Sequence, residues 1–150
     1  MRYFLSLGSN LGEREQTINL ALEMIERQIG QILCRSSFYY SEPWGFDSPN
    51  AFCNICCAVE TPLQPLEMLA HTQTIERALG RTQKSADGHY SDRTIDIDII
   101  RAFDDDGQEI HVSQPTLLIP HPLWQQRDFV RLPLQQITAL HYQFLTRFVR

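Results

Sequence analysis

Apolar residues follow two different patterns near the start of the chain. Residues 2–7 form a run of aromatic and aliphatic side chains, typical of a strand, which ends at the glycine-containing segment 8–12. From about Glu13, apolar residues recur at intervals of three and four, which predicts a long amphipathic helix. Residues 36–41 are β-prone and are predicted to form a second strand. The apolar positions of the helix are Ile18, Ala21, Leu22, Ile25, Ile29 and Ile32.

The middle of the chain repeats the succession of strand and helix. Residues 52–60 are predicted to form a third strand, and 94–101 a fourth. Between them, a second helix is predicted to open near Pro62 and to stop at Gly80, because glycine readily adopts the conformation that ends a helix. Residues 84–91 are polar and lack periodicity, which predicts a loop. The apolar positions of this helix include Leu66, Leu69, Ile75 and Leu79.

The resulting order, β-α-β-β-α-β, predicts an α+β fold with a ferredoxin-like core, followed by a C-terminal extension. In such a core, helices pack on an antiparallel sheet. Residues 104–107, three aspartates and a glycine, predict a hairpin turn. The extension is expected to be irregular with short helices, because proline recurs in it. These prolines are Pro115, Pro120, Pro122 and Pro133. A length of 150 residues favours one domain, 1–150.

Composition and charge narrow the choice of function. The formal net charge of −5 argues against broad binding of nucleic acid, which needs a basic surface. The sequence has no uninterrupted apolar stretch of about 18 residues, the length that predicts a transmembrane helix. Residues 1–8 lack the apolar core and cleavage site of a signal peptide. We therefore expect a cytoplasmic protein, a monomer, with neither nucleic acid nor membrane as a partner.

The cysteines raise the question of a metal or redox site. Cys53 and Cys56 have the CxxC spacing found in such sites. Positions three apart on a strand point to opposite faces, so the predicted strand 52–60 would separate the two thiols. The sequence offers no second CxxC or close histidine pair to complete a zinc site. We interpret Cys34, Cys53, Cys56 and Cys57 as small core residues.

Two acidic residues on the fourth predicted strand are the first candidates for chemistry. Residues 94–99 alternate between polar and apolar, so Asp96 and Asp98 share one face of the strand. Two adjacent carboxylates repel each other unless a positive charge joins them, and Mg²⁺ prefers such oxygen ligands. The pattern alone is equally compatible with a solvated strand face.

Basic residues lie on both sides of this acidic pair in the sequence. Arg81, Lys84 and Arg93 precede it, and Arg127 follows it. Carboxylates for Mg²⁺ and guanidinium groups for phosphate oxygens are what phosphoryl transfer requires. The sequence contains neither GxxxxGKS/T nor GxGxxG, so metal and arginine would have to hold the phosphates.

Short motifs extend over nearly the whole chain in a fixed order. The first five are LGSNLG at 7–12, PWG at 43–45, FCN at 52–54, IE at 75–76 and GR at 80–81. The others are DRTIDIDI at 92–99, IPHP at 119–122, RDFV at 127–130 and PL at 133–134. As a set they resemble the 6-hydroxymethyl-7,8-dihydropterin pyrophosphokinase family of folate biosynthesis.

The resemblance implies a reaction. The hydroxymethyl oxygen of the dihydropterin attacks the β-phosphorus of ATP, AMP leaves, and the product is the pterin diphosphate. By the family pattern, Asp96 and Asp98 hold two Mg²⁺ ions that bridge the phosphates of ATP. Arg81 and Arg93 match catalytic arginines that contact phosphate as charge moves to the leaving AMP.

The same resemblance implies a pocket for the pterin. Phe52 and Phe129 match a clamp of two aromatic rings around the flat heterocycle, and Asn54 offers a donor and an acceptor to its edge. Phe52 and Asn54 are two positions apart on a predicted strand, so they share a face. Backbone groups near Ser41 and Trp44 complete the pocket.

Positions that contact ATP in the family are matched by a further group of residues. Gln73 and Glu76 are three apart on a predicted helix, and His121 lies between two prolines. The chain departs from the family pattern where Tyr90 replaces a tryptophan and Gln83 a basic residue. The full group of ATP-contacting positions is Gln73, Glu76, Lys84, Ile99, His121 and Arg127, with Thr116 and Leu118 as weaker matches.

Two other interpretations stay open at this point. The first is a different Mg²⁺-dependent phosphotransferase or phosphohydrolase on the same fold, which would use ATP without a pterin pocket. The second is an inactive pterin- or nucleotide-binding module, which would be expected to lack the acidic pair or the arginines.

Overall fold

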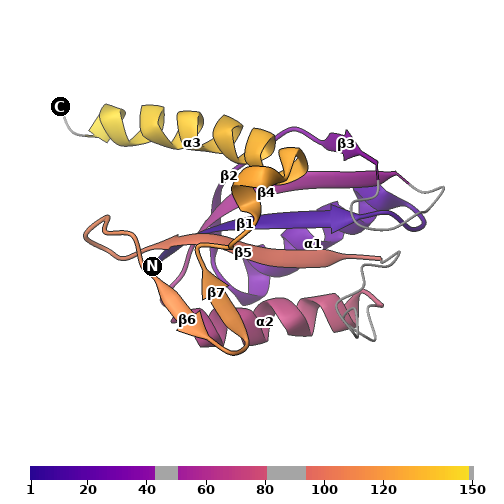
Figure 1. The fold of residues 1–150 in the computed structure, drawn as a ribbon, viewed down its shortest axis with the longest axis horizontal. Helices are drawn as coiled ribbons and strands as arrows, with labels where there is room; N and C mark the ends of the chain where they lie inside the picture. The colour runs from indigo at the N-terminus through magenta and orange to yellow at the C-terminus, as the bar shows by residue number, and fades with distance from the viewer. Residues whose placement is uncertain (43–50, 81–93, 149–150) are drawn as a thin grey trace.

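The structure is a computed structural model that describes residues 1–42, 51–80 and 94–148. Its centre is a five-stranded antiparallel sheet with the order β2-β4-β1-β5, and a short β3 pairs with β4 (Figure 1). β1 therefore has a hydrogen-bonded neighbour on each side. The strands are β1 (Arg2–Ser9), β2 (Gln31–Arg35), β3 (Tyr39–Ser41), β4 (Phe52–Glu60) and β5 (Asp96–Phe103).

Helices cover both faces of this sheet (Figure 1). α1 (Arg14–Gln28) and α2 (Pro65–Ala78) lie on one face, and α3 (Asp128–Phe148) lies along the other. A small hairpin of β6 (Val112–Gln114) and β7 (Leu117–Ile119) lies beside β5 and α2. The described part of the chain thus contains an antiparallel sheet between two helical layers, and no helix in it is long and apolar enough to cross a membrane.

Each face of the sheet has its own hydrophobic core, because successive side chains of a strand point to opposite faces. Leu5 of β1 packs with Ile18 of α1 and Ile97 of β5 on one face. Phe4, its neighbour in sequence, packs with Leu134 of α3 on the other face. The predicted interval of the first helix is confirmed up to Ile25, since its buried residues are Ile18, Ala21, Leu22 and Ile25. The prediction is wrong at Ile32, because the helix ends at Gln28 and Ile32 lies in β2, a strand that was not predicted.

A register shift between β1 and β5 separates the acidic part of β5 from the part that packs under α3. Leu5 lies opposite Ile99 and Phe4 lies opposite Arg101, so Ile100 is the extra residue of a β-bulge. Ile99 joins the core beneath α1 and α2, whereas Ile100 joins the core beneath α3. The regular alternation of β5 therefore holds over its first five residues, which include both aspartates, and is lost only after Ile100, since Ala102 packs in the same core as Ile99.

The predicted strand at 36–41 is correct only in its second half. β2 ends at Arg35 and β3 begins at Tyr39. Between them, the hydroxyl of Ser36 accepts a hydrogen bond from the Cys56 N–H at 2.9 Å and donates one to the Ser37 carbonyl at 2.9 Å. A side-chain oxygen thus takes the place of a backbone carbonyl, which interrupts the strand without leaving the Cys56 N–H unpaired.

The C-terminal segment differs most from the prediction. Instead of an irregular segment with short helices, it contains the β6–β7 hairpin, one short 3₁₀ helix (Trp124–Gln126) and the long helix α3. Pro133 lies inside α3, where a proline removes a hydrogen bond and costs about 3 kcal/mol. Burial of Val130, Leu134 and Ile137 along one side of the helix offsets that cost, because each gives about 1.5–3 kcal/mol.

The helix boundaries and the predicted turn have local causes. α2 begins at Pro65, later than expected, because Gln64 and Glu67 form a capping box around its first turn. Gly80 follows the helix with a φ of +102°, as predicted for a stop. The predicted turn at 104–107 is confirmed by a hydrogen bond of 3.0 Å from the Gly107 N–H to the Asp104 carbonyl.

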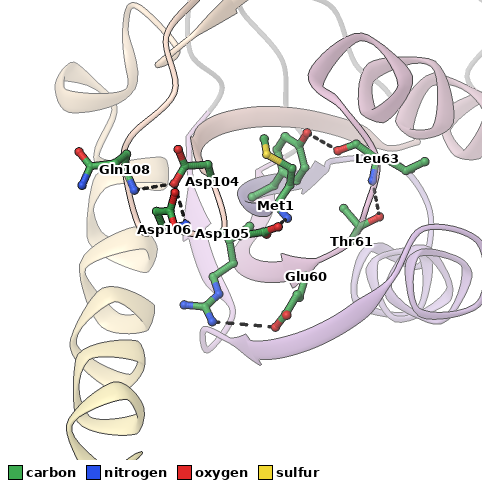
Figure 2. Close-up of polar contacts among 10 residues, drawn as sticks. Met1, Glu60, Thr61, Leu63, Asp104, Asp105, Asp106 and Gln108 are labelled. Atoms are coloured by element: carbon green, nitrogen blue, oxygen red, sulfur yellow. Dashed lines mark hydrogen bonds and ion pairs between the residues drawn. The ribbon is translucent and has the colours of Figure 1, made fainter. Parts of the chain in front are cut away.

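Polar contacts fix the end of the sheet where β1 begins and β5 ends (Figure 2). The Asp104 carboxylate accepts hydrogen bonds from the N–H groups of Asp106 and Gln108, both at 2.9 Å. The Tyr3 hydroxyl donates to the Leu63 carbonyl at 2.6 Å, which ties the segment between β4 and α2 to β1. The opposite end of the sheet, where β5 begins, carries the candidate site.

Candidate active site

The two registers of β1 align the predicted site residues in rows across the sheet. Gly8 lies opposite Asn54 of β4 on one side and opposite Asp96 of β5 on the other. Two residues earlier, Ser6 lies between Cys56 and Asp98 in the same way. Side chains directly opposite each other in antiparallel strands share a face. Asn54 and both aspartates therefore lie on the α3 face, at the C-terminal end of β1.

Gly8 is required at the centre of its row because the Asn54 side chain leans across it. A Cβ at this position would lie 2.7 Å from Asn54 Oδ1 and 3.7 Å from Cδ1 of Phe52. Asn54 is buried, and its Nδ2 donates to the Ser41 hydroxyl at 3.1 Å. The structure thus brings together Ser41, Phe52 and Asn54, and it confirms that Phe52 and Asn54 share a face.

Glu76 fixes the backbone between the two aspartates. Its Oε2 accepts a hydrogen bond of 2.9 Å from the N–H of Ile97, and the glutamate is 2% exposed. Ile97 is a core residue between the half-buried Asp96 and Asp98. The carboxylate of Glu76 therefore has a structural role that the sequence did not indicate, and its contact with ATP stays a prediction.

A cleft of about 300 Å³ follows the outer edge of β5. It brings Asp98, Ile99 and His121 of the prediction together between α2 and the β6–β7 hairpin. Gln73 lies on α2 one turn after Leu69, which is itself in the wall of the cleft. The lining residues are Leu69, Ile97, Asp98, Ile99, Pro115, Thr116, Leu117, Leu118, His121 and Pro122.

Five of these lining residues were not predicted as site residues: Leu69, Ile97, Pro115, Leu117 and Pro122. Leu69 follows the helical interval, so the sequence suggested only a core position. Pro115 and Pro122 suggested breaks in regular structure. These residues line the cleft because the β6–β7 hairpin packs beside β5. A local sequence pattern does not predict this packing.

His121 is held as a neutral imidazole. The backbone N–H of His121 donates to the Ile100 carbonyl at 2.9 Å, and its ring Nδ1 accepts a hydrogen bond from the backbone N–H of Leu123 at 3.2 Å. Burial and the positive charge of Arg127 lower the pKa of His121 to about 4, although Asp96 acts in the opposite direction. With Nδ1 occupied as an acceptor, the proton of the neutral ring lies on Nε2, which remains a donor.

Arg127 and Phe129 lie at the start of α3. Arg127 is 4% exposed, and its guanidinium carbon lies 5.9 Å from the centroid of the Phe129 ring. Next to Phe129, the carbonyl of Val130 accepts a bond of 3.6 Å from the thiol of Cys56. Because Cys56 belongs to the row of Ser6, the start of α3 is anchored directly over the site face. The predicted residues Trp44, Arg81, Lys84 and Arg93 lie outside the described part of the chain.

The acidic pair fits a magnesium site in which substrate supplies the remaining ligands. Within residues 1–42, 51–80 and 94–148, no group of three or more histidine, cysteine, aspartate or glutamate side chains forms a metal cage. Mg²⁺ in proteins is commonly held by one or two carboxylates plus waters and substrate phosphates, whereas structural zinc sites use four protein ligands. Asp96 and Asp98 match the former arrangement.

The two cysteines of the CxxC motif lie on opposite faces of the sheet, as predicted. Cys53 packs beneath α1 and α2, whereas Cys56 packs beneath α3. Burial raises the pKa of Cys53 to about 11 and that of Cys56 to about 12, so both thiols are protonated at neutral pH. All four cysteines are free: Cys53, Cys56 and Cys57 are buried core residues, whereas Cys34 is partly buried and packs against the core beneath α3.

Comparison with known proteins assigns the family. The sequence model of 7,8-dihydro-6-hydroxymethylpterin-pyrophosphokinase (HPPK) matches residues 4–139. The chain belongs to the HPPK family. A 2-amino-4-hydroxy-6-hydroxymethyldihydropteridine pyrophosphokinase from Porphyromonas gingivalis is 48% identical over 139 residues, with 89% of this chain and 88% of the relative covered. The Bacillus subtilis protein of the same name is 33% identical, with 89% and 76% covered.

Solved structures of HPPK-DHPS proteins share the fold. One of them, in complex with substrates, superposes with a TM-score of 0.63 at 15% identity, and the superposition covers 87% of the present chain. A Plasmodium falciparum HPPK-DHPS triple mutant gives a TM-score of 0.63 at 18% identity and covers 89%. The chain spans only 39% and 40% of those two structures.

The buried state of His121 predicts a pH dependence of stability. An unfolded histidine takes up its proton near pH 6.5, whereas the folded imidazole does so only near a pKa of about 4. The unfolded chain therefore binds more protons in this window, and the free energy of unfolding falls as the pH drops from about 6.5 to 4. Urea denaturation of wild type and His121→Gln at several pH values should show a shallower fall for the variant. A midpoint near 6.5 for the His121 imidazole in an NMR titration would contradict this account.

Proposed function

We propose that the chain transfers pyrophosphate from ATP to the hydroxymethyl group of 6-hydroxymethyl-7,8-dihydropterin, giving AMP and the pterin diphosphate used in folate biosynthesis. The observation that carries the proposal is the row Asn54–Gly8–Asp96. It unites, on one face and across one glycine, the amide expected to recognise a pterin and a carboxylate expected to hold metal. Membership of the HPPK family supports the same reaction.

The pterin is proposed to bind on the α3 face beside Gly8. Asn54 presents its amide there, with Ser41 in hydrogen-bonding contact and Phe52 alongside. Phe129 comes from α3 above the same face, so it can supply the second ring of the predicted clamp. In this arrangement the pterin stacks between the two rings, and the Asn54 amide forms hydrogen bonds with its edge. Its hydroxymethyl group would then point toward the acidic pair.

ATP is proposed to occupy the cleft along β5. The apolar side chains of Leu69, Ile99 and Leu117 suit the flat face of a purine. The Nε2–H of neutral His121 can donate to a ribose or phosphate oxygen, and buried Arg127 supplies positive charge nearby. We propose that the phosphates of ATP lie beside Asp98, which lines the same cleft.

Asp96 and Asp98 are proposed to hold Mg²⁺, two ions by the family pattern. When bound, the metal neutralises phosphate charge and fixes the phosphorus for an in-line displacement. The chain's own contribution is orientation: the strand pairing aligns the carboxylates with Ser6 and Gly8, and Glu76 fixes the backbone between them. Arg81 and Arg93 are proposed to contact phosphate as charge moves to the leaving AMP.

The sheet order also supports the predicted split β-α-β core. β1 lies between β4 and β5, and each of the two helices of that unit connects strands that are separated in the sheet. We propose that this core, with α3 closing the second face, is a single pyrophosphokinase domain.

One assay tests the reaction. The protein, ATP, Mg²⁺ and the dihydropterin alcohol are mixed, and nucleotide products are separated by chromatography. We expect AMP in stoichiometric amount with the pterin diphosphate. Production of ADP would instead indicate a different phosphotransferase. Binding of both substrates without any turnover would indicate an inactive binding module.

The acidic pair is tested by isosteric substitution. Asp96→Asn and Asp98→Asn should each lower kcat about a hundredfold or more, because each removes a charge that the transition state requires. Both variants should stay folded, since the carboxylates are half-buried and lie on the site face. Asp106→Asn, at an exposed turn on the opposite end of the sheet, is the matched control and should retain full activity. Wild-type activity in Asp98→Asn would refute the metal assignment.

The substitution Gly8→Ala tests whether the close packing of Asn54 over Gly8 is needed for pterin binding. The added methyl group would displace the Asn54 amide from its position 2.7 Å away. Losing one hydrogen bond to the pterin costs about 1–1.5 kcal/mol, so the KM for the pterin should rise about tenfold while that for ATP changes little. Gly12→Ala is the control, because its Cβ would meet nothing within 4 Å and only its φ of +64° adds strain. Equal effects of the two substitutions on the pterin KM would argue against the proposed pocket.

A further inference from the structure

Two consecutive residues in the first turn of α1 contact the chain on both sides of the Ser41–Phe52 pair. Arg14 Nη1 donates to the carbonyl of Ala51 at 2.7 Å, and its guanidinium carbon lies 5.5 Å from the centroid of the Tyr40 ring. Glu15 Oε1 accepts a hydrogen bond of 2.8 Å from the Tyr40 hydroxyl. Arg14 and Glu15 also form an ion pair, with 3.9 Å between Arg14 Nη2 and Glu15 Oε1. Tyr40 directly precedes Ser41, and Ala51 directly precedes Phe52.

These contacts reach the pterin-facing residues from the opposite side of the sheet. In the β3–β4 pairing, Tyr40 lies opposite Cys53 and Ser41 lies opposite Phe52. Cys53 belongs to the core beneath α1 and α2, so Tyr40 points to the α1 side. Ser41 points to the face of Asn54, with which it forms a hydrogen bond. The residues that α1 contacts, Tyr40 and Ala51, do not face the site. Tyr40 is adjacent in sequence to Ser41, and Ala51 to Phe52, which do face it.

β3 needs such support because it is weakly attached to the sheet. It has three residues, and in the described part of the chain its strand partner is β4. A strand this short has few ladder hydrogen bonds, and short edge elements open locally at low free-energy cost. Arginine suits the role, since its planar guanidinium can stack on a ring and donate to a carbonyl at once, which an ammonium group cannot match.

We infer that Arg14 and Glu15 are positioning residues for pterin binding: through Tyr40 and Ala51 they hold Ser41 and Phe52 in register on the site face. The inference rests on the proposed function, because it assigns Ser41 and Phe52 to the pterin. Neither Arg14 nor Glu15 faces the site, so their effect is on the geometry of the pocket and not on the chemical step.

Steady-state kinetics of Arg14→Met and Glu15→Leu test the inference. We expect the pterin KM to rise about tenfold in Arg14→Met and several-fold in Glu15→Leu, with kcat and the ATP KM within twofold of wild type. Glu15→Gln retains an acceptor oxygen for the Tyr40 hydroxyl and should restore most of the affinity. Tyr40→Phe should reproduce the effect of Glu15→Leu, and the double variant Glu15→Leu/Tyr40→Phe should be no worse than either single variant.

Arg35→Met is the matched control. Arg35 also stacks on a ring, with its guanidinium carbon 4.9 Å from the centroid of Phe38, and it donates to Asn19 of α1 at 3.0 Å. It reaches neither Tyr40 nor Ala51 by these contacts, so its loss should leave the pterin KM unchanged. A rise in Arg35→Met equal to that in Arg14→Met would overturn the inference, as would a fall in kcat with an unchanged pterin KM.

Hydrogen exchange on the ligand-free protein separates this inference from the proposed function. Arg14→Met should accelerate exchange of the backbone amides of Tyr40, Ser41 and Phe52, whereas Arg35→Met should not. Unchanged exchange in Arg14→Met would overturn the positioning role whether or not the wild-type protein is active. Failure of the wild type to form AMP, with exchange altered as expected, would reject the proposed reaction and retain the structural role of α1.

Discussion

The pairing of β1 with both of its neighbours is the constraint on which the candidate site depends. Because β1 binds β4 on one side and β5 on the other, a single strand sets the positions of Asn54 and Asp96 relative to each other. A slip of one residue in either register would turn the affected side chains to the opposite face. The two hydrophobic cores prevent such a slip, since it would move Leu5 and Phe4 out of the cores that each now fills.

The sequence predicted the parts of this arrangement that depend on local periodicity. The alternation around Asp96 and Asp98 predicted a shared face, and the register of β5 places both on it. The interval of Ile18 to Ile25 predicted the buried side of α1. The same reasoning separated Cys53 from Cys56, and each is buried in a different core. In these cases the side-chain period of a strand or helix is sufficient, because it needs no knowledge of distant segments.

Features that arise from contacts between distant segments could not be predicted in this way. The Ser36 hydroxyl replaces a backbone acceptor for Cys56, which only the fold brings near. α3 forms in spite of Pro133 because the sheet offers an apolar face that buries Leu134 and its neighbours. The cleft exists because the β6–β7 hairpin packs beside β5, so Leu69 lines it although its helical pattern does not distinguish it from a core residue.

The charges around the acidic pair lead to one further conclusion about the site. His121 is electrostatically coupled to Asp96, but its lowered pKa makes it neutral at physiological pH, so it adds a hydrogen-bond donor and no positive charge. Buried Arg127 supplies a fixed positive charge in the same neighbourhood. His121 can therefore serve a ligand only as a hydrogen-bond donor, whereas the guanidinium of Arg127 keeps its positive charge throughout the physiological pH range.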